Sequence, residues 1–442
     1  MALLGAGAAW ALPVQITDHA GAGCAIDAPV ASSDASVVAF SSTCDLTGGN
    51  TDGNREIFQY VAGAGVSQLT DTTGCANMAP ALSSDGSVVA FDSDCDLTGQ
   101  NADGSVEIFV YDGSGFTQVT AGQFCTSAAP SLDAAGTKVA FDSDCDLTGA
   151  NADQSSEIFQ ATIGGATTQL TSDTAGLGCG SFDAASNAAG DLIAFDSDCD
   201  LTGQNTDQIV EIFQVASDRT VTQLTFSIDD TCGSGPPASD ASGMYVSFES
   251  SCDFTGGNAD GSVEIFEVGP TRTKQLTAAD QTPMCESQRA RASAGGEWVV
   301  YQGFCDPTGA NPDGGFEVFR ATEAGVLQVT SGAACSSFAP VVASAARSAV
   351  FVSDCDPAGS NADGSEELFV ESLCVCGSPA SGNQPPDLPT ATDALFALRA
   401  AVGSALCASC DCDVNSSGGI TATDALLILK AAVGGGVTLV CP

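Results

Sequence analysis

The chain has 442 residues, including 20 cysteines, and its 55 acidic and 11 basic side chains give a formal net charge of −44. This charge repels nucleic acid and anionic lipid, so neither is expected as a partner. No stretch approaches ~18 uninterrupted apolar residues, so no membrane span is predicted. Most cysteines are regularly spaced without histidine or C-x-x-C partners, which indicates disulfides of a secreted, periplasmic or cell-surface protein.

The N-terminal residues 1–11 are apolar and end in Ala9-Trp10-Ala11, a small-x-small pattern typical of signal-peptide cleavage, although no basic residue precedes it. We interpret this segment as a short or truncated signal peptide. Residues 12–371 are expected to form one repeat domain. A linker rich in glycine, serine and proline (372–386) and a small helical module (387–442) follow it.

Seven cysteine pairs recur along the repeat domain, and in each pair the second cysteine follows the first by 20 residues. Successive pairs are about 50 residues apart, a period typical of β-propeller blades with four antiparallel strands. We therefore predict a mainly β fold, a seven-bladed propeller followed by a small α-helical module. The pairs are Cys24/Cys44, Cys75/Cys95, Cys125/Cys145, Cys179/Cys199, Cys232/Cys252, Cys285/Cys305 and Cys335/Cys355.

The second repeat shows the four strands expected of a blade. Residues 77–82 and 87–92 flank a Ser-Ser-Asp-Gly turn, and residues 107–111 and 116–120 form a second hairpin. The fourth strand ends in Gln-Leu-Thr or Gln-Val-Thr in six repeats. A seventh copy, Gln15-Ile16-Thr17, precedes the first repeat, while the last repeat stops after its third strand. Residues 14–17 are therefore predicted to complete the seventh blade and close the ring.

The midpoint of each cysteine pair falls in the turn between the first two strands of its repeat. Residues equidistant from a hairpin turn face each other across the strand pair, within reach of a disulfide. We thus predict one disulfide in each blade, joining the two cysteines of each pair given above. Each disulfide would join two loops on the face of the ring where we expect the binding surface. A loop of this size contributes on the order of 3 kcal/mol by the chain-entropy account.

The repeats resemble the TolB-like β-propeller family over roughly residues 14–371. The matching motifs are the Gln-Leu-Thr ending, the Pro-x-x-Ser-x-Asp-Gly hairpin at residues 80–86 and the Val-Ala-Phe-x-Ser strand at residues 89–93. The resemblance implies the propeller fold. It does not imply one function, because propellers of this type serve as binding platforms, periplasmic accessory proteins and non-catalytic parts of peptidases.

The loop between the second and third strands repeats an Asn-x-Asp pattern followed by a glutamate. Hard oxygen ligands at this spacing suit calcium, so a cation-binding acidic face is one interpretation. The other is an Asx-turn, in which these side chains cap their own backbone. The set is Asn50, Asp52, Glu56, Asn101, Asp103, Glu107, Asn151, Asp153, Glu157, Asn205, Asp207, Glu211, Asn258, Asp260, Glu264, Asn311, Asp313, Glu317, Asn361, Asp363 and Glu367.

The C-terminal module contains a duplicated helical segment, residues 390–403 and 421–434, with apolar residues at helical spacing. The loop before the second copy follows a calcium-loop pattern and resembles a type I dockerin repeat. The resemblance implies calcium as cofactor and a cohesin-like protein partner. The first copy lacks the earlier ligand positions and is interpreted as a helix without a metal. The implied ligands are Asp413, Asn415, Ser417, Thr421 and Asp424, with the carbonyl of Gly419.

The remaining six cysteines are expected to form three disulfides, whose pairing the sequence leaves open. They are Cys374, Cys376, Cys407, Cys410, Cys412 and Cys441.

Catalysis is not indicated by the residues. His19 is the single histidine, no Gly-x-Ser-x-Gly motif occurs, and near-identical repeats single out no carboxylate pair. We therefore predict an exported, non-enzymatic binding or scaffold protein with an acidic, cation-binding face and a calcium-dependent docking module. The alternatives are a carbohydrate-active or peptidase accessory enzyme, or a purely structural cell-surface protein.

Overall fold

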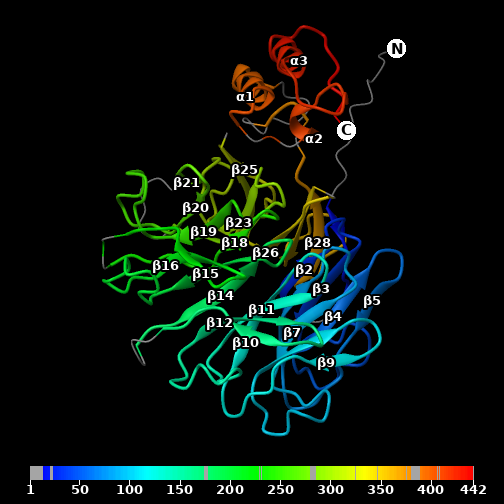
Figure 1. Ribbon diagram of the computed structural model, residues 1–442. Helices are drawn as coiled ribbons and strands as arrows, with labels where there is room; N and C mark the ends of the chain where they lie inside the picture. The colour runs from blue at the N-terminus through cyan, green and yellow to red at the C-terminus, as the bar shows by residue number, and fades with distance from the viewer. Residues whose placement is uncertain are drawn as a thin grey trace.

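The computed structural model describes residues 13–441 except 20–22, 174–177, 228, 230, 279–284, 324, 346, 375, 380–388, 406 and 408. The predicted signal segment, residues 1–11, lies outside the described residues. The described chain forms seven four-stranded antiparallel sheets. They are arranged as the blades of a propeller, with three helices in the C-terminal part (Figure 1). The predicted fold class is confirmed.

The strands follow one another in sequence order within the first six blades. Blades one and two contain β2 (Ile26–Ala31), β3 (Val37–Ser42), β4 (Glu56–Val61), β5 (Gly65–Gln68), β6 (Asn77–Leu82), β7 (Val89–Ser93), β8 (Glu107–Tyr111) and β9 (Phe116–Gln118). Blades three and four contain β10 (Ser127–Leu132), β11 (Lys138–Ser143), β12 (Glu157–Thr162), β13 (Thr167–Gln169), β14 (Ser181–Ser186), β15 (Leu192–Ser197), β16 (Glu211–Ala216) and β17 (Val221–Gln223).

Blades five and six contain β18 (Ala238–Ser239), β19 (Val246–Ser250), β20 (Glu264–Val268), β21 (Thr273–Gln275), β22 (Ser287–Ala292), β23 (Val299–Gly303), β24 (Glu317–Thr322) and β25 (Gly325–Gln328). The seventh blade contains β26 (Ser337–Ala343), β27 (Ser348–Ser353), β28 (Glu367–Ser372) and the N-terminal β1 (Val14–Gln15). Val14 pairs with Val370 and Gln15 with Phe369. The N-terminal strand therefore closes the ring, as the displaced Gln-Ile-Thr segment predicts.

The core of each blade is built on a pair of aromatic rings that face each other across the second and third strands. Examples are Phe40 with Phe58 and Phe141 with Phe159, whose centroids lie 5.7 Å and 5.9 Å apart. These rings are fully buried. The residues on the opposite face of the middle strands, such as Ala39 and Ile57, are buried as well, which explains why these strands read as nearly continuous apolar runs.

The first strand of each blade lies on the inner side of the ring, where it contacts the first strand of the next blade. In six blades this strand contains a β-bulge opposite the second strand. The third residue of each of these six strands has a positive φ: Ala28, Ala79, Ala129, Asp183, Arg289 and Ala339. Blade five differs, because its first strand is reduced to the two residues of β18.

Every predicted disulfide of the repeats is formed in the structure, one per blade. The seven bonds are Cys24–Cys44, Cys75–Cys95, Cys125–Cys145, Cys179–Cys199, Cys232–Cys252, Cys285–Cys305 and Cys335–Cys355. Their Cα atoms lie 4.9 to 5.3 Å apart, as expected for residues that face each other across a hairpin.

The six remaining cysteines form Cys374–Cys410, Cys376–Cys441 and Cys407–Cys412. Ten disulfides are typical of a protein that folds in an oxidising compartment. Within the described residues, no helix is long and apolar enough to cross a membrane.

The C-terminal helices are α1 (Ala391–Ala401), α2 (Ser409–Cys412) and α3 (Ala422–Ala432), and they lie above the blades near β25 (Figure 1). Helices α1 and α3 begin with matching capping boxes, Thr390 with Asp393 and Thr421 with Asp424. A buried ion pair joins this part to the sixth blade, where Arg320 Nη1 lies 2.9 Å from Asp411 Oδ2.

Candidate functional site

Each repeat disulfide joins a partly exposed first cysteine to a buried second one, so only one end of each bond is accessible from the propeller face. The second cysteine of every pair is buried; in blades five and six, for example, Cys252 is 1% exposed and Cys305 is 6% exposed. These sulfur atoms are therefore structural and cannot contact a ligand on the propeller face. The full set of buried second cysteines is Cys44, Cys95, Cys145, Cys199, Cys252, Cys305 and Cys355.

The asparagines of the repeated polar loop are buried and hold the loop together. Each Nδ2 donates to the carbonyl of the preceding cysteine and to that of the residue four positions on, as Asn101 does to Cys95 (3.2 Å) and Ser105 (2.8 Å). The same pair of bonds recurs in all seven blades. In blades five and six the cysteine carbonyls are those of Cys252 and Cys305. The amide groups are therefore occupied by the backbone.

The glutamates of this loop are also buried, and they attach the outer strand of the blade to its neighbour. Glu157 accepts the hydroxyl of Thr171 through Oε2 (2.5 Å) and the N–H of Asp173 through Oε1 (2.6 Å). The threonine hydroxyl in turn accepts the N–H of Ile158. This unit explains why threonine ends each Gln-Leu-Thr or Gln-Val-Thr segment. Burial, partly offset by the hydrogen bond from Thr171, raises the pKa of Glu157.

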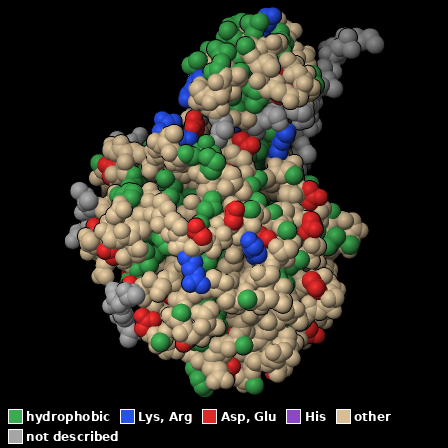
Figure 2. Space-filling view, viewed as in Figure 1, with side chains coloured by type: hydrophobic (Ala, Val, Ile, Leu, Met, Phe, Trp, Pro, Cys, Tyr) green, Lys and Arg blue, Asp and Glu red, His purple; other side chains and the backbone are tan. Residues whose placement is uncertain are grey.

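Only the aspartates of the repeated loop face solvent. Asp52, Asp103, Asp153, Asp207, Asp260, Asp313 and Asp363 are exposed, whereas the asparagine and glutamate of each set are buried. The structure therefore does not bring the three predicted residues of a blade to one surface. That the exposed aspartates bind a cation stays a prediction. Acidic side chains are spread across the molecular face seen in Figure 2, and basic side chains are few.

A different group of carboxyls gathers on the inner side of the ring. The fourth position of the Val-Ala-Phe-x-Ser strand carries an acid in four successive blades: Asp92, Asp142, Asp196 and Glu249. In the other three blades the same position is Ser41, Gln302 or Val352. The repeats are thus not equivalent at this position.

Most of these side chains accept a backbone N–H from the bulge residue of the next blade. Asp92 accepts from Ala129 (3.1 Å), and Glu249 accepts from Arg289 (2.5 Å). Gln302 accepts from Ala339 in the same way (2.7 Å). This bond fixes the inner side chain between adjacent blades.

Asp196 lacks such a donor. The residue of blade five that corresponds to the bulge position is Pro236, which has no N–H. Proline also cannot adopt the positive φ of the other bulge residues, which explains the shortened β18. Asp196 is 8% exposed, and its Oδ1 has no hydrogen-bond partner among the described residues.

A neighbouring acid from the first strand of blade four completes the cluster. The carboxyl of Asp183 interacts with that of Asp196, and burial raises the pKa of Asp183. Burial first, and then the charge of Asp183, raises the pKa of Asp142 to about 7 and that of Asp196 to about 8. We call Asp142, Asp183 and Asp196 the inner carboxyl cluster.

Two arginines of blade six carry the nearest positive charge. The Arg291 guanidinium interacts electrostatically with Asp183 and Glu249 and opposes the burial that raises their pKa values. The neighbouring Arg289 lowers the pKa of Arg291 further after burial has lowered it. Burial and mutual repulsion therefore oppose ionisation of the cluster, and for Asp183 the charge of Arg291 partly offsets this.

The C-terminal loop places several predicted calcium ligands together. Asp413 Oδ1 and Asn415 Oδ1 both accept the N–H of Ser417 at 2.9 Å, and Asp413 Oδ2 accepts the N–H of Gly418 at 2.8 Å. Asp424 is fully buried, and its Oδ1 has no hydrogen-bond partner among the described residues. Asp424 Oδ2 accepts the hydroxyl of Thr421.

Sequence reasoning missed the inner carboxyl cluster because it treated the repeats as near-identical. A usable signal was present: one polar position varies inside an otherwise constant apolar strand. The Gly-Pro-Pro segment at residues 235–237 was the second signal, because it interrupts the bulge in a single blade.

Known structures share the fold. No protein-family model matches the chain, and no curated protein matches it. An oligogalacturonate lyase from Vibrio parahaemolyticus is similar with a TM-score of 0.51 and 12% identity, over 78% of this chain and 88% of that one. The propeller domain of the trilobed protease from Pyrococcus furiosus has a TM-score of 0.50 and 10% identity, over 79% of this chain and 96% of that one. A putative TolB from Agrobacterium tumefaciens has a TM-score of 0.41 and 15% identity, over 70% and 94%.

The class defined by the structure is a seven-bladed β-propeller of four-stranded antiparallel blades. The prediction of a non-enzymatic binding or scaffold protein was wrong. It rested on the absence of familiar catalytic motifs. Propellers of this fold occur in a lyase and in a protease. At such low identity these likenesses show the fold and assign no reaction.

Proposed function

We propose that the propeller binds a divalent cation at the inner carboxyl cluster. One observation carries the proposal: Asp196 is a buried carboxyl with an oxygen that receives no donor among the described residues, beside two further acids. Buried carboxylates raise each other's pKa. A bound cation would relieve the repulsion between them and take the place of a proton that the cluster otherwise holds. Oxygen ligands of this kind suit calcium. The proposal is independent of whether the protein also catalyses a reaction.

Calorimetric titration with calcium chloride tests this proposal. The second calcium site proposed below is removed first by Asp413→Asn and Asp424→Asn. We expect one remaining site whose affinity rises between pH 6 and 8 as about one proton is released per ion. Proton release is measured by repeating the titration in buffers of different ionisation enthalpy.

Asp196→Asn should abolish this remaining site. Asp92→Asn is the matched control: Asp92 occupies the same strand position and also has one oxygen without a partner among the described residues, but its other oxygen accepts the N–H of Ala129, and it does not belong to the inner carboxyl cluster. If the loop-deficient protein binds no calcium at pH 8, or if Asp196→Asn binds as well as its parent, the cluster is not a cation site.

We also propose calcium as the ligand of the loop from Asp413 to Asp424, in a dockerin-like module formed by residues 387–442. The buried, unpartnered Oδ1 of Asp424 supports this proposal, as does the convergence of Asp413 and Asn415 on one N–H within the described loop. A bound ion would neutralise these oxygens and stabilise the start of α3. The residues that would hold the ion are Asp413, Asn415, Ser417, Thr421 and Asp424, with the carbonyl of Gly419.

Chelation tests the loop site by its effect on folding. Removal of calcium should lower the melting temperature of the C-terminal part in the parent and leave the Asp424→Asn variant unchanged. A cohesin-like partner is the protein that such a module would bind, and pull-down with and without calcium tests it. An unchanged melting curve of the parent after chelation would refute calcium binding by the loop.

A further inference from the structure

Each Gln-Leu-Thr-type segment ends in a threonine. In the six cases that the structure describes, the residue two positions after this threonine lies against the disulfide of a blade. Its backbone N–H donates to the buried glutamate, as in Thr72 to Glu56 and His19 to Glu367. Its side chain faces the sulfur atoms. Thr72 Oγ1 lies 3.4 Å from Cys95 Sγ, and Ser227 Oγ lies 3.0 Å from Cys232 Sγ. The repeat thus builds the same position in successive blades and fills it differently.

Two blades leave no room at this position. A Cβ on Gly122 would lie 2.3 Å from Cys125 Sγ, and one on Gly332 would lie 2.3 Å from Cys335 Sγ. A third blade places a carboxylate there, with Asp173 Oδ2 2.8 Å from Cys179 Sγ. An acid beside a sulfur disfavours the thiolate and therefore opposes reduction of that disulfide.

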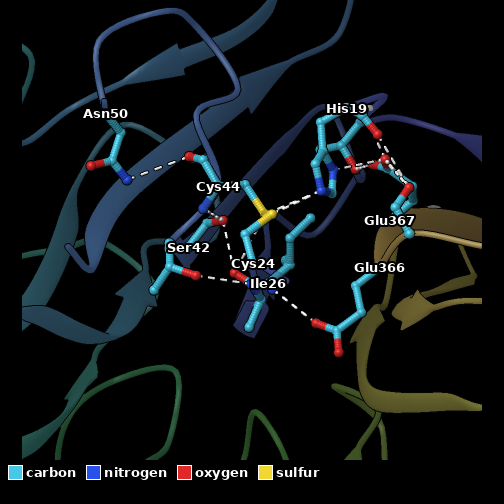
Figure 3. The surroundings of a disulfide bond; sticks show 12 residues. His19, Cys24, Ile26, Ser42, Cys44, Asn50, Glu366 and Glu367 are labelled. Carbon is cyan, nitrogen blue, oxygen red and sulfur yellow. Dashed lines mark hydrogen bonds and ion pairs between the residues drawn. A yellow bond between two sulfur atoms is a disulfide. The ribbon is translucent and has the colours of Figure 1, made fainter. Parts of the chain in front are cut away.

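His19 occupies this position over the first blade's disulfide (Figure 3). Its Nε2 lies 2.8 Å from Cys24 Sγ and 3.4 Å from Cys44 Sγ. On the opposite edge of the imidazole, Nδ1 lies 2.9 Å from Glu367 Oε1. Nδ1 thus faces the carboxylate without making a hydrogen bond among the described residues, and the second nitrogen, Nε2, faces both sulfur atoms. Among the six blades whose equivalent residue the structure describes, this is the one that can give a proton to a leaving sulfur.

We propose that Cys24–Cys44 is a thiol–disulfide exchange site for a dithiol reductant, with His19 as the group that stabilises the leaving thiolate. Cys24 is partly exposed, whereas Cys44 is buried, so the approach is to Cys24. The thiolate of the dithiol attacks Cys24 Sγ and forms a mixed disulfide. The bond between Cys24 and Cys44 breaks, and Cys44 Sγ leaves with the electron pair toward His19 Nε2.

The second thiol of the reductant then attacks its own sulfur in the mixed disulfide. Cys24 Sγ leaves as a thiolate, again beside His19 Nε2. Overall, the dithiol is oxidised to a disulfide, the cysteine pair is reduced, and the two thiol protons pass to the two cysteine sulfurs. The reverse sequence reoxidises the pair with a disulfide reagent.

The site lies at the seam of the ring. His19 follows the closing strand β1, Glu367 begins β28 of the seventh blade, and Cys24 precedes β2 of the first. Glu366 Oε2 also accepts the N–H of Ile26 across this seam (3.1 Å). Exchange at Cys24–Cys44 therefore changes a covalent constraint at the junction between the two ends of the propeller.

Partial reduction of the native full-length protein with dithiothreitol tests the proposal. Free thiols are trapped with N-ethylmaleimide at timed intervals and assigned by peptide mass spectrometry, so the other six blades serve as internal controls. We expect Cys24–Cys44 to be reduced at least about tenfold faster than Cys75–Cys95, because a stabilised thiolate is the better leaving group.

Exchanging the residues of two blades distinguishes stabilisation of the leaving thiolate by His19 from a general loosening of the junction between the first and seventh blades. His19→Thr gives the first blade the residue of the second and should slow reduction of Cys24–Cys44 to the rate of Cys75–Cys95. A variant that merely loosened the seam would be reduced faster instead. Thr72→His should accelerate reduction of Cys75–Cys95. Equal rates in the parent, or an unchanged or faster rate in His19→Thr, would overturn the proposal.

Discussion

Pro236 occupies the position at which neighbouring blades present a backbone N–H inward, and Asp196 is the side chain that loses its donor as a result. The corresponding residues Ala129, Arg289 and Ala339 each donate to the inner side chain of the preceding blade. Pro236 therefore makes the hydrogen bonding of Asp196 differ from that of the inner side chains that accept such an N–H, an asymmetry between otherwise similar blades.

Restoring the N–H should remove that asymmetry. We predict that Pro236→Ala lowers the pKa of Asp196 and stabilises the protein by about 1 kcal/mol at pH 8, the value of a typical hydrogen bond. Alanine tolerates the required backbone, since Ala79 and Ala129 have φ of 44° and 51°. The pKa is measured by NMR titration of the carboxyl carbon. Pro237→Ala is the control, and an equal pKa shift in that variant would contradict the explanation.

The inner carboxyl cluster should make stability fall as pH rises. A carboxyl with a raised pKa in the folded state keeps its proton longer than in the unfolded chain, whose aspartates titrate near ~3.9. For Asp196, with a folded pKa of about 8, stability is therefore lost progressively between roughly pH 4 and 8. We predict that Asp196→Asn is the more stable protein at pH 8, by on the order of 2 kcal/mol, in urea titrations with chelator present.

An exposed aspartate provides a control, because its pKa is shifted in the opposite direction and its contribution to stability should depend on pH in the opposite way. Hydrogen bonds, first from the backbone N–H of Ser87 and then from its hydroxyl, lower the pKa of Asp85. Its stabilising effect is present above pH 4 and is lost on acidification. Asp85→Asn should thus be less stable than the parent at pH 7 and similar to it at low pH. If both variants respond to pH alike, the burial argument for Asp196 fails.

The ion pair between Arg320 and Asp411 should attach the C-terminal part firmly to the sixth blade. Both residues are at most 3% exposed, and the guanidinium also lies over the ring of Trp298. Asp411→Ala leaves a buried, uncompensated charge and should cost about 3–5 kcal/mol. The double variant Arg320→Met, Asp411→Leu should cost less. Urea unfolding of the three proteins checks this order, and a costlier double variant would contradict it.

The closing strand depends on Thr17. Its hydroxyl donates to Glu367 and accepts the N–H of Leu368 at 2.8 Å. Thr17→Val should destabilise the protein by about 1–3 kcal/mol and increase hydrogen exchange in β28, because a buried N–H loses its acceptor. Thr120→Val removes the equivalent acceptor of Ile108 inside a continuous blade, so β28 should stay protected there. Unchanged exchange of β28 in Thr17→Val would contradict this role.

The sequence was sufficient to predict the architecture, because the same blade pattern recurs in seven repeats and each copy supports the same interpretation. The pairing of Cys75 with Cys95 follows from hairpin symmetry, and the ring closure follows from one displaced Gln-Ile-Thr segment. The role of Asn101 did not follow, because exposed ligation and buried capping need the same residue types at the same spacing. The inner carboxyl cluster depends on contacts between blades, such as that of Asp142 in blade three with Asp183 in blade four, which no local pattern contains.

The seventh blade is the one blade whose outer strand reaches it from the opposite end of the propeller, and that strand is the two-residue β1. The other six outer strands continue directly from their own hairpins. Under tension applied through the two ends of the propeller, the load would therefore meet first the short ladder between Val14 and Val370 and the contacts of Thr17. The Cys24–Cys44 bond lies just behind that ladder, where it would limit how far the first blade extends once the ring has opened.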